Sequence, residues 1–287
     1  TNRGRPHGVR VSGKSIKAVA AASDEEGGVL VVASALPTIP KPNSAMRALS
    51  VRGGFDATTV ATAGTVVGTA NALMMWSSPE EAGKIYLPNT PLTPLLTWFM
   101  ENMAAALTCV TITSWCLLKG VDSTLAAGFG FIPWLLAGCK ALLNNYPGKC
   151  GVPAAPQYFV NALNVFGAWA MLTQQAFAPD VIKGFAAWIG LNGVAMALAP
   201  KPAIDAWGVK SVDDTTLVFV KAFGYFMCAN AAMLAGIALD EPAAKIIGYG
   251  WAPCMLSILD GLFVSKNVEK LGMNKDAQYF WLAVQAA

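Results

Sequence analysis

The feature that most limits how this chain can fold is a series of long apolar runs from residue 57 onward. Each run ends near a proline or a glycine, and most of the runs carry little or no charge over their whole length. A helix needs about 20 apolar residues to cross the hydrocarbon of a membrane, and unbroken runs favour helices over alternating strands. We therefore predict an all-α membrane protein. The runs are residues 57–76, 93–118, 123–145, 157–177, 181–199, 214–239, 243–265 and 276–287.

Composition agrees with a membrane protein and argues against several kinds of site. Only 13% of the residues are charged, whereas a soluble domain has about 25%. The net charge of +3 is too small to predict nucleic-acid binding. The one histidine, His7, precedes the apolar runs, so we expect no haem and no zinc in the membrane part. The six cysteines form no CxxC pair, and we interpret them as reduced core residues rather than as a disulfide or metal framework.

The chain also repeats itself. The stretch "GFGFIP" at 128–133 returns as "GYGWAP" at 248–253, and "QYF" at 157–159 returns at 278–280. These matches predict two tandem four-helix membrane repeats, residues 57–178 and 179–287, about eight helical segments in all. An even number of helices in each unit makes the two repeats parallel in the membrane, related by a pseudo-twofold axis along its normal. The last segment is too short to cross the membrane straight.

Four charged residues within or at the ends of the apolar runs form two pairs. Glu101 corresponds to Lys221, and Lys140 corresponds to Asp260, each 120 positions later. The midpoint of each pair falls in a short turn between two helices, so both partners stand at the same height in an antiparallel hairpin. Reversal of sign with the pair retained favours a salt bridge over a proton relay or a pigment ligand. We predict structural ion pairs Glu101–Lys140 and Lys221–Asp260.

Amide side chains in the apolar runs are the candidate binding residues. One interpretation is hydrogen bonding between helices, worth roughly 0.6–2 kcal/mol each. The other is coordination of chlorophyll magnesium, a hard ion that takes oxygen ligands. Amides that occur in both repeats are the stronger candidates. The candidates are Asn71, Asn192, Gln157, Gln278 and Asn102, and the further unpaired amides are Asn161, Asn164 and Asn230.

Tryptophans near the ends of the runs allow two interpretations, a belt at the membrane interface or rings that face a pigment. They are Trp76, Trp98, Trp115, Trp207 and Trp281. The sequence contains neither G-x-S-x-G nor HExxH, and it has no second histidine that could act as a base. We therefore expect no catalytic activity.

The N-terminal region, residues 1–56, differs from the rest. Five basic residues precede the first acidic one, and alanine, serine, glycine and proline are frequent. This composition is typical of an organelle transit peptide. Such a segment cannot bury a core of its own, so we expect an extended basic tail that lies against a partner or lipid headgroups.

Two resemblances add expectations about function. With "NGVAMALAP", "AWGV" and "FVKAFGYF" between residues 192 and 226, the second unit resembles small four-helix membrane proteins of the DoxX-like type. This likeness implies an alternative function, a small-molecule membrane oxidoreductase or transporter acting near quinone or thiol chemistry.

The N-terminal region with "SVRGGF" at 50–55 resembles nuclear-encoded plastid proteins of algae with red-lineage plastids. The whole chain is similar in kind to polytopic linker subunits between photosystem I and its antennae. This resemblance implies a non-catalytic subunit of the thylakoid membrane, with photosystem and light-harvesting antenna subunits and membrane lipids as partners. It allows chlorophyll and carotenoid as cofactors. Arginine does not occur after Arg52, so the antenna motif that needs glutamate and arginine on one helix is missing.

Overall fold

The structure is a computed structural model that describes residues 57–209 and 211–286, and every regular element within them is a helix. The predicted tail at residues 1–56 lies outside these residues. Five of the described helices are long and apolar enough to cross a membrane, which supports an integral multi-pass membrane protein. They are α3 (Pro94–Leu118), α4 (Ser123–Leu143), α7 (Ala178–Leu198), α9 (Asp214–Ala238) and α10 (Ala243–Leu259), the last continued by the π-helical turn η2 (Asp260–Val264).

Three further helices correspond to the other predicted segments. Helices α1 (Ala57–Ser77) and α6 (Ala154–Leu172) are long, but they are not among the spans defined by length and apolarity. Threonines in α1 and amides in α6 lower their hydropathy. Helix α12 (Lys275–Ala286) has 12 residues, which at 1.5 Å per residue is too short to cross the hydrocarbon.

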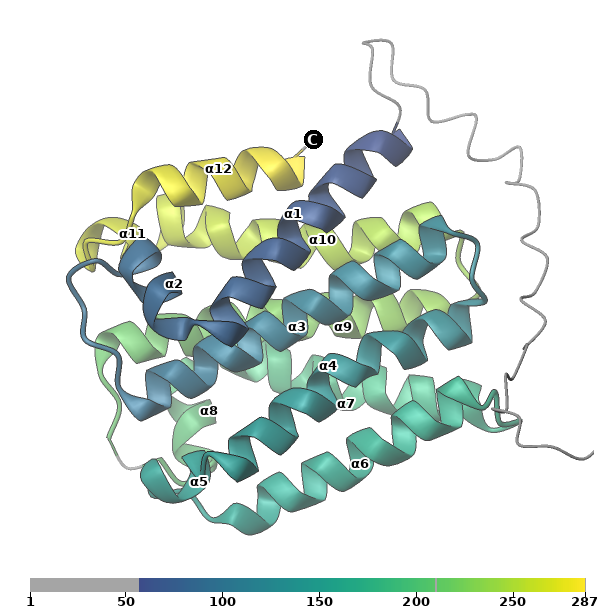
Figure 1. Cartoon of the computed structure of the whole chain (residues 1–287), viewed down its shortest axis with the longest axis horizontal. Helices are drawn as coiled ribbons and strands as arrows, with labels where there is room; N and C mark the ends of the chain where they lie inside the picture. The colour runs from purple at the N-terminus through teal and green to yellow at the C-terminus, as the bar shows by residue number, and fades with distance from the viewer. Residues whose placement is uncertain (1–56, 210, 287) are drawn as a thin grey trace, which may run out of the picture. The chain divides into compact units, whose positions relative to one another are not determined.

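Four short helices, which the sequence did not lead us to expect, lie in the connections. They are α2 (Pro79–Tyr86), α5 (Tyr146–Lys149), α8 (Pro200–Ala206) and α11 (Asn267–Lys270). All four start with or close to a proline or follow a residue with positive φ. Figure 1 shows them together at one end of the helices, on the left, whereas the tight turns after α3 and α9 lie at the other end.

The order of long and short helices in the first half recurs in the second. Each helix from α7 to α12 starts 120 or 121 positions after its counterpart, so α7 corresponds to α1 and α9 to α3. The capping residues recur as well: Thr93 accepts a hydrogen bond from a backbone N–H of α3, and Asp213 does the same for α9. The positive-φ residues Gly120, Asn145 and Gly151 have positive-φ counterparts in Asp240, Lys266 and Gly272.

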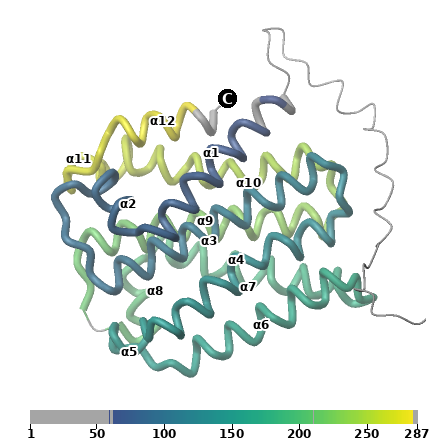
Figure 2. Tube along the Cα trace, in the orientation of Figure 1, coloured from purple at the N-terminus to yellow at the C-terminus, as the bar shows by residue number. Residues whose placement is uncertain are grey.

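The two halves also pack in the same way. Helix α3 packs between α1 and α4, and α6 packs on α4; in the second half α9 packs between α7 and α10, and α12 packs on α10. The halves meet where α3 contacts α9, and α3 also contacts α10 while α4 contacts α9. Figure 2 shows α3 and α9 in the middle with α6 and α12 at opposite edges.

The side-chain amide of Asn230 links α3 and α9 by a hydrogen bond. Asn230 donates from Nδ2 to the backbone oxygens of Ala106 on α3 (3.0 Å) and Phe226 on α9 (2.8 Å). Asn230 therefore joins α3 to α9, which are corresponding helices of the two halves. For Asn230, therefore, the structure favours interhelical hydrogen bonding over ligand binding.

Candidate functional site

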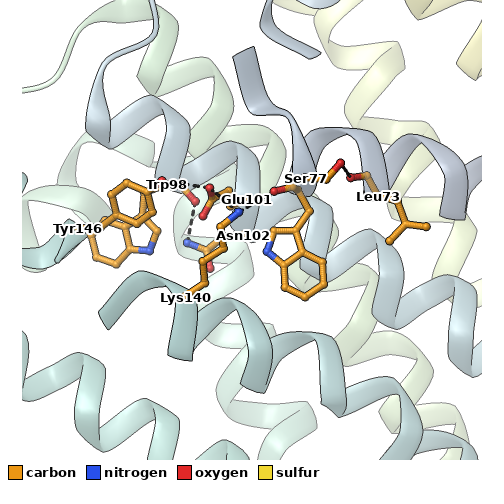
Figure 3. A network of polar contacts seen from close by, with 8 residues as sticks. Leu73, Ser77, Trp98, Glu101, Asn102, Lys140 and Tyr146 are labelled. Carbon is orange, nitrogen blue, oxygen red and sulfur yellow. Dashed lines mark hydrogen bonds and ion pairs between the residues drawn. The ribbon is translucent and has the colours of Figure 1, made fainter. Parts of the chain in front are cut away.

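Glu101 lies inside the protein between three helices. Its side chain is 3% exposed, and its Oε1 lies 3.0 Å from Lys140 Nζ. Tyr146, at the start of α5, donates from its hydroxyl to the same oxygen, also at 3.0 Å. Figure 3 shows Glu101, Lys140 and Tyr146 pointing toward one another from α3, α4 and the segment after α4. The carboxylate that interrupts the apolar run is thus held by protein groups.

Lys140 extends this cluster to a fourth helix. Its ammonium also donates to the backbone oxygen of Trp76, near the C-terminal end of α1, at 2.6 Å. The ring of Trp98 stacks on Tyr146, with 6.2 Å between the centroids. Because removing water from two charges costs several kcal/mol per ion, a buried pair persists only when further hydrogen bonds satisfy it. Here Tyr146 and the Trp76 carbonyl supply those bonds.

The second predicted pair has the opposite polarity. Lys221 on α9 lies 2.6 Å, Nζ to Oδ2, from Asp260 at the start of the π-helical turn. In each half, therefore, the structure brings together the two charges that the sequence paired, between the helices that flank the tight turn. A pair kept with its sign reversed fits a structural role.

The pair around Glu101 gives a testable pH dependence. Burial, followed by the negative charge of Glu101, raises the pKa of Tyr146 to about 12, whereas an unfolded tyrosine has a pKa of about 10. The neutral phenol therefore adds stability that is fully present below about pH 10 and is lost as the pH rises toward 12. We expect thermal unfolding midpoints to fall less between pH 9.5 and 11.5 in Tyr146→Phe than in the parent protein. Equal slopes would show that folding does not raise the pKa of Tyr146.

Beside this ion pair lies a cavity with a volume of about 370 Å³, called the larger cavity below. Its walls come from α3, α4 and α6 of the first half and from α7, α9 and the end of α8 of the second half. Three of the five predicted binding residues line it: Asn102, Gln157 and Asn192. Asn161 and Asn164, the two further amides on α6, line it as well.

The three predicted amides present oxygens that are free to bind. Asn102 and Asn192 each donate from Nδ2 to the backbone oxygen four residues earlier, at 3.0 and 2.8 Å. Gln157 donates from Nε2 to Asn161 Oδ1 at 3.0 Å. The oxygens of these three side chains accept no hydrogen bond from the residues that the structure describes. Asn164 is 5% exposed, and within 57–209 and 211–286 its amide has no hydrogen-bond partner.

Tryptophans form much of the remaining wall. Trp98, Trp134, Trp188 and Trp207 line the cavity. The indole N–H groups of Trp98 and Trp134 are buried and find no acceptor in the described part of the chain. Such groups are rare, because an unpaired buried donor costs about 1–3 kcal/mol. Trp134 and Trp188 were missed from the sequence, although Trp188 stands one helical turn before Asn192.

The other two predicted residues, Asn71 and Gln278, line the smaller cavity of about 110 Å³. The Asn71 oxygen already accepts a hydrogen bond, which the Tyr86 hydroxyl donates at 2.6 Å. Trp281 Nε1 in turn donates to the Tyr86 oxygen at 2.8 Å. Burial raises the pKa of the Tyr86 phenol, so it remains a neutral donor. The structure therefore divides the five candidates into two cavities: the larger has three free amide oxygens, whereas in the smaller the Asn71 oxygen is occupied.

The two cavities are built from corresponding positions. In the larger cavity the lining residues are Trp98, Asn102, Gly138, Val152, Gln157, Val160, Asn192, Trp207 and Phe223. In the same order, their counterparts 120 or 121 positions away in the smaller cavity are Val218, Ala222, Ile258, Met273, Gln278, Trp281, Asn71, Tyr86 and Met103. Each cavity thus lies between three helices of one half and the first two long helices of the other.

Comparison with known proteins gives no relative: no protein-family model, no curated protein and no solved structure matches the chain. Among the described residues, no three histidine, cysteine, aspartate or glutamate side chains form a group that could hold a metal ion. The site is therefore defined by its own geometry, an amide- and tryptophan-lined cavity of a multi-pass membrane protein.

Proposed function

We propose that the chain is a non-catalytic accessory subunit of a thylakoid pigment–protein complex and that its larger cavity binds a planar apolar pigment. The observation that carries this proposal is the set of free amide oxygens of Asn102, Gln157 and Asn192 in a cavity walled by tryptophans. A volume of about 370 Å³ is within the range of small-molecule sites, about 300–1,000 Å³.

Chlorophyll fits the residues that are present. Magnesium takes oxygen ligands, so an amide oxygen of Asn102, Gln157 or Asn192 would hold it. Indole rings pack well on flat aromatic systems, and four tryptophans line the cavity. Bound chlorophyll would supply light absorption and energy transfer, and a carotenoid would use the apolar walls alone.

We further propose that the two halves are tandem parallel repeats related by a pseudo-twofold axis along the membrane normal. The recurring helix boundaries, positive-φ residues and ion pairs support this. So does the packing of α3 on its counterpart α9, because a twofold axis brings the same surface of both units together. In this arrangement the ion pairs clamp one wall of each cavity.

The proposed partners are photosystem and antenna subunits. Large aromatic side chains are exposed along α6, which suits a face covered by lipid or by a neighbouring membrane subunit. They are Tyr158, Phe159, Phe166 and Trp169. The plastid location rests on the resemblance at residues 50–55, and the basic tail is proposed to extend over adjacent subunits.

Pigment analysis of the purified native complex tests the proposal. We expect this subunit to migrate with a photosystem and to contain chlorophyll in a fixed ratio. Asn102→Leu, Gln157→Leu and Asn192→Leu together should lower that ratio by one chlorophyll per chain, because all three free amide oxygens are removed. Gln175→Leu, an amide change outside both cavities, is the matched control. A colourless complex, or an unchanged ratio in the triple variant, would contradict pigment binding in this cavity.

A second candidate, a DoxX-like membrane oxidoreductase or transporter, is favoured by the place of the cavity. Transporters built from repeats bind substrate at the interface between the repeats, and residues from both halves line this cavity. A colourless, free-standing oligomer whose cysteines respond to oxidants would favour this candidate.

A further inference from the structure

The smaller cavity is lined by positions that correspond to those of the larger one, but the side chains at these positions differ. Val160 on α6 corresponds to Trp281 on α12, and both line their cavities. Trp281 is 8% exposed, and its indole N–H is bonded to Tyr86. An indole thus fills space in the second half where the first half has only an isopropyl group.

Further positions also differ between the cavities. A side chain at Gly138 would collide with the amide of Asn161, so this glycine leaves room for that amide. The corresponding positions hold Ile258 and Leu282, and Ala222 replaces Asn102. At these positions the smaller cavity has gained bulk at Ile258 and lost two amides, while it retains Gln278 as the counterpart of Gln157.

We infer that the smaller cavity is a closed second site for the same class of planar apolar ligand, with Trp281 in the place that the ligand takes in the larger cavity. Val160 and Trp281 then decide which cavity is open, so each chain binds one ligand rather than two. Two hydrogen bonds, from Trp281 to Tyr86 and from Tyr86 to Asn71, hold the Trp281 indole in this place. This inference rests on the proposed function only in the class of ligand.

Exchanging the two residues tests the inference. Chlorophyll a, titrated in detergent against the purified full chain, is followed by quenching of tryptophan fluorescence and by the ratio of pigment to protein that co-elutes. We expect one site in the parent protein, none in Val160→Trp and two in Trp281→Val. The added site should lose affinity in Trp281→Val combined with Gln278→Leu, because that change removes the counterpart of the Gln157 amide oxygen.

The outcomes separate the two proposals. If the parent binds one pigment, Val160→Trp binds none and Trp281→Val still binds one, then pigment binding stands and the closed second site is wrong. If neither the parent nor Val160→Trp binds pigment but Trp281→Val does, the proposed function fails. The inference that Trp281 closes the smaller cavity is then supported. Ile258→Ala opens the smaller cavity from the opposite wall; two sites in this variant would support the inference even if Trp281→Val does not fold.

Discussion

Replacing Lys140 with methionine is expected to lower the free energy of unfolding by about 3 kcal/mol, the scale seen when a buried ion pair loses one partner. The substitution leaves the Glu101 carboxylate, 3% exposed, with Tyr146 as its one remaining partner. It also removes the hydrogen bond that Lys140 donates to the Trp76 carbonyl, so α1 loses this link to α4. Denaturant or thermal unfolding in a fixed detergent, followed by circular dichroism, measures the change.

Two further variants show whether the unpaired charge causes the loss. Glu101→Leu combined with Lys140→Met should be more stable than Lys140→Met alone, since no buried charge is left unpaired. Lys183→Met breaks an exposed pair with Asp180, and we expect a loss below about 1 kcal/mol. If Lys140→Met costs no more than Lys183→Met, the clamp does not hold the fold together. Exchanging Glu101 and Lys140 should be tolerated better than either single change, as the reversed pair of Lys221 and Asp260 suggests.

Gly224→Ala is expected to destabilise the second half by about 2–3 kcal/mol through overpacking. A Cβ at Gly224 would meet the backbone of Ala197 and Gly193 on α7, and backbone cannot move aside as a flexible side chain can. Helix α7 packs more extensively on α9 than any other pair of helices in the described chain, so the damage falls on the main contact of that half. In the first half the corresponding residues are Ala72 and Ala104, both fully buried.

The same substitution at Gly184, on α7, is the matched control. A Cβ there meets nothing within 4 Å, so Gly184→Ala should gain about 0.5–1 kcal/mol from the lower entropy of the unfolded chain. Opposite signs for the two glycine-to-alanine changes, measured as unfolding midpoints in one detergent, are the expected result. Loss of stability in both variants would show that the close approach of α7 to α9 is not what distinguishes the two sites.

The features that the sequence by itself determined depend only on distances along one helix or one hairpin. The apolar runs and their prolines predicted where the long helices lie. The ion pairs were also predictable, because two residues equally far from a tight turn reach the same height when both helices rise 1.5 Å per residue. Glu101 and Lys140 therefore meet whatever the other helices do. The four short helices escaped prediction because 4 to 8 residues, one or two turns, leave almost no periodic signal.

The tertiary structure alone decided which residues share a cavity. Asn102, Gln157 and Asn192 lie on three helices from two halves of the chain, and their meeting depends on how those helices pack side by side. Lateral packing in a membrane depends on close van der Waals fit rather than on a pattern of apolar and polar residues, since lipid is as apolar as the helices. For the same reason the sequence made Asn71 and Asn192 equal candidates for ligand binding. Only the fold revealed that Tyr86 and Trp281 close the site of Asn71, whereas Val160 leaves that of Asn192 open.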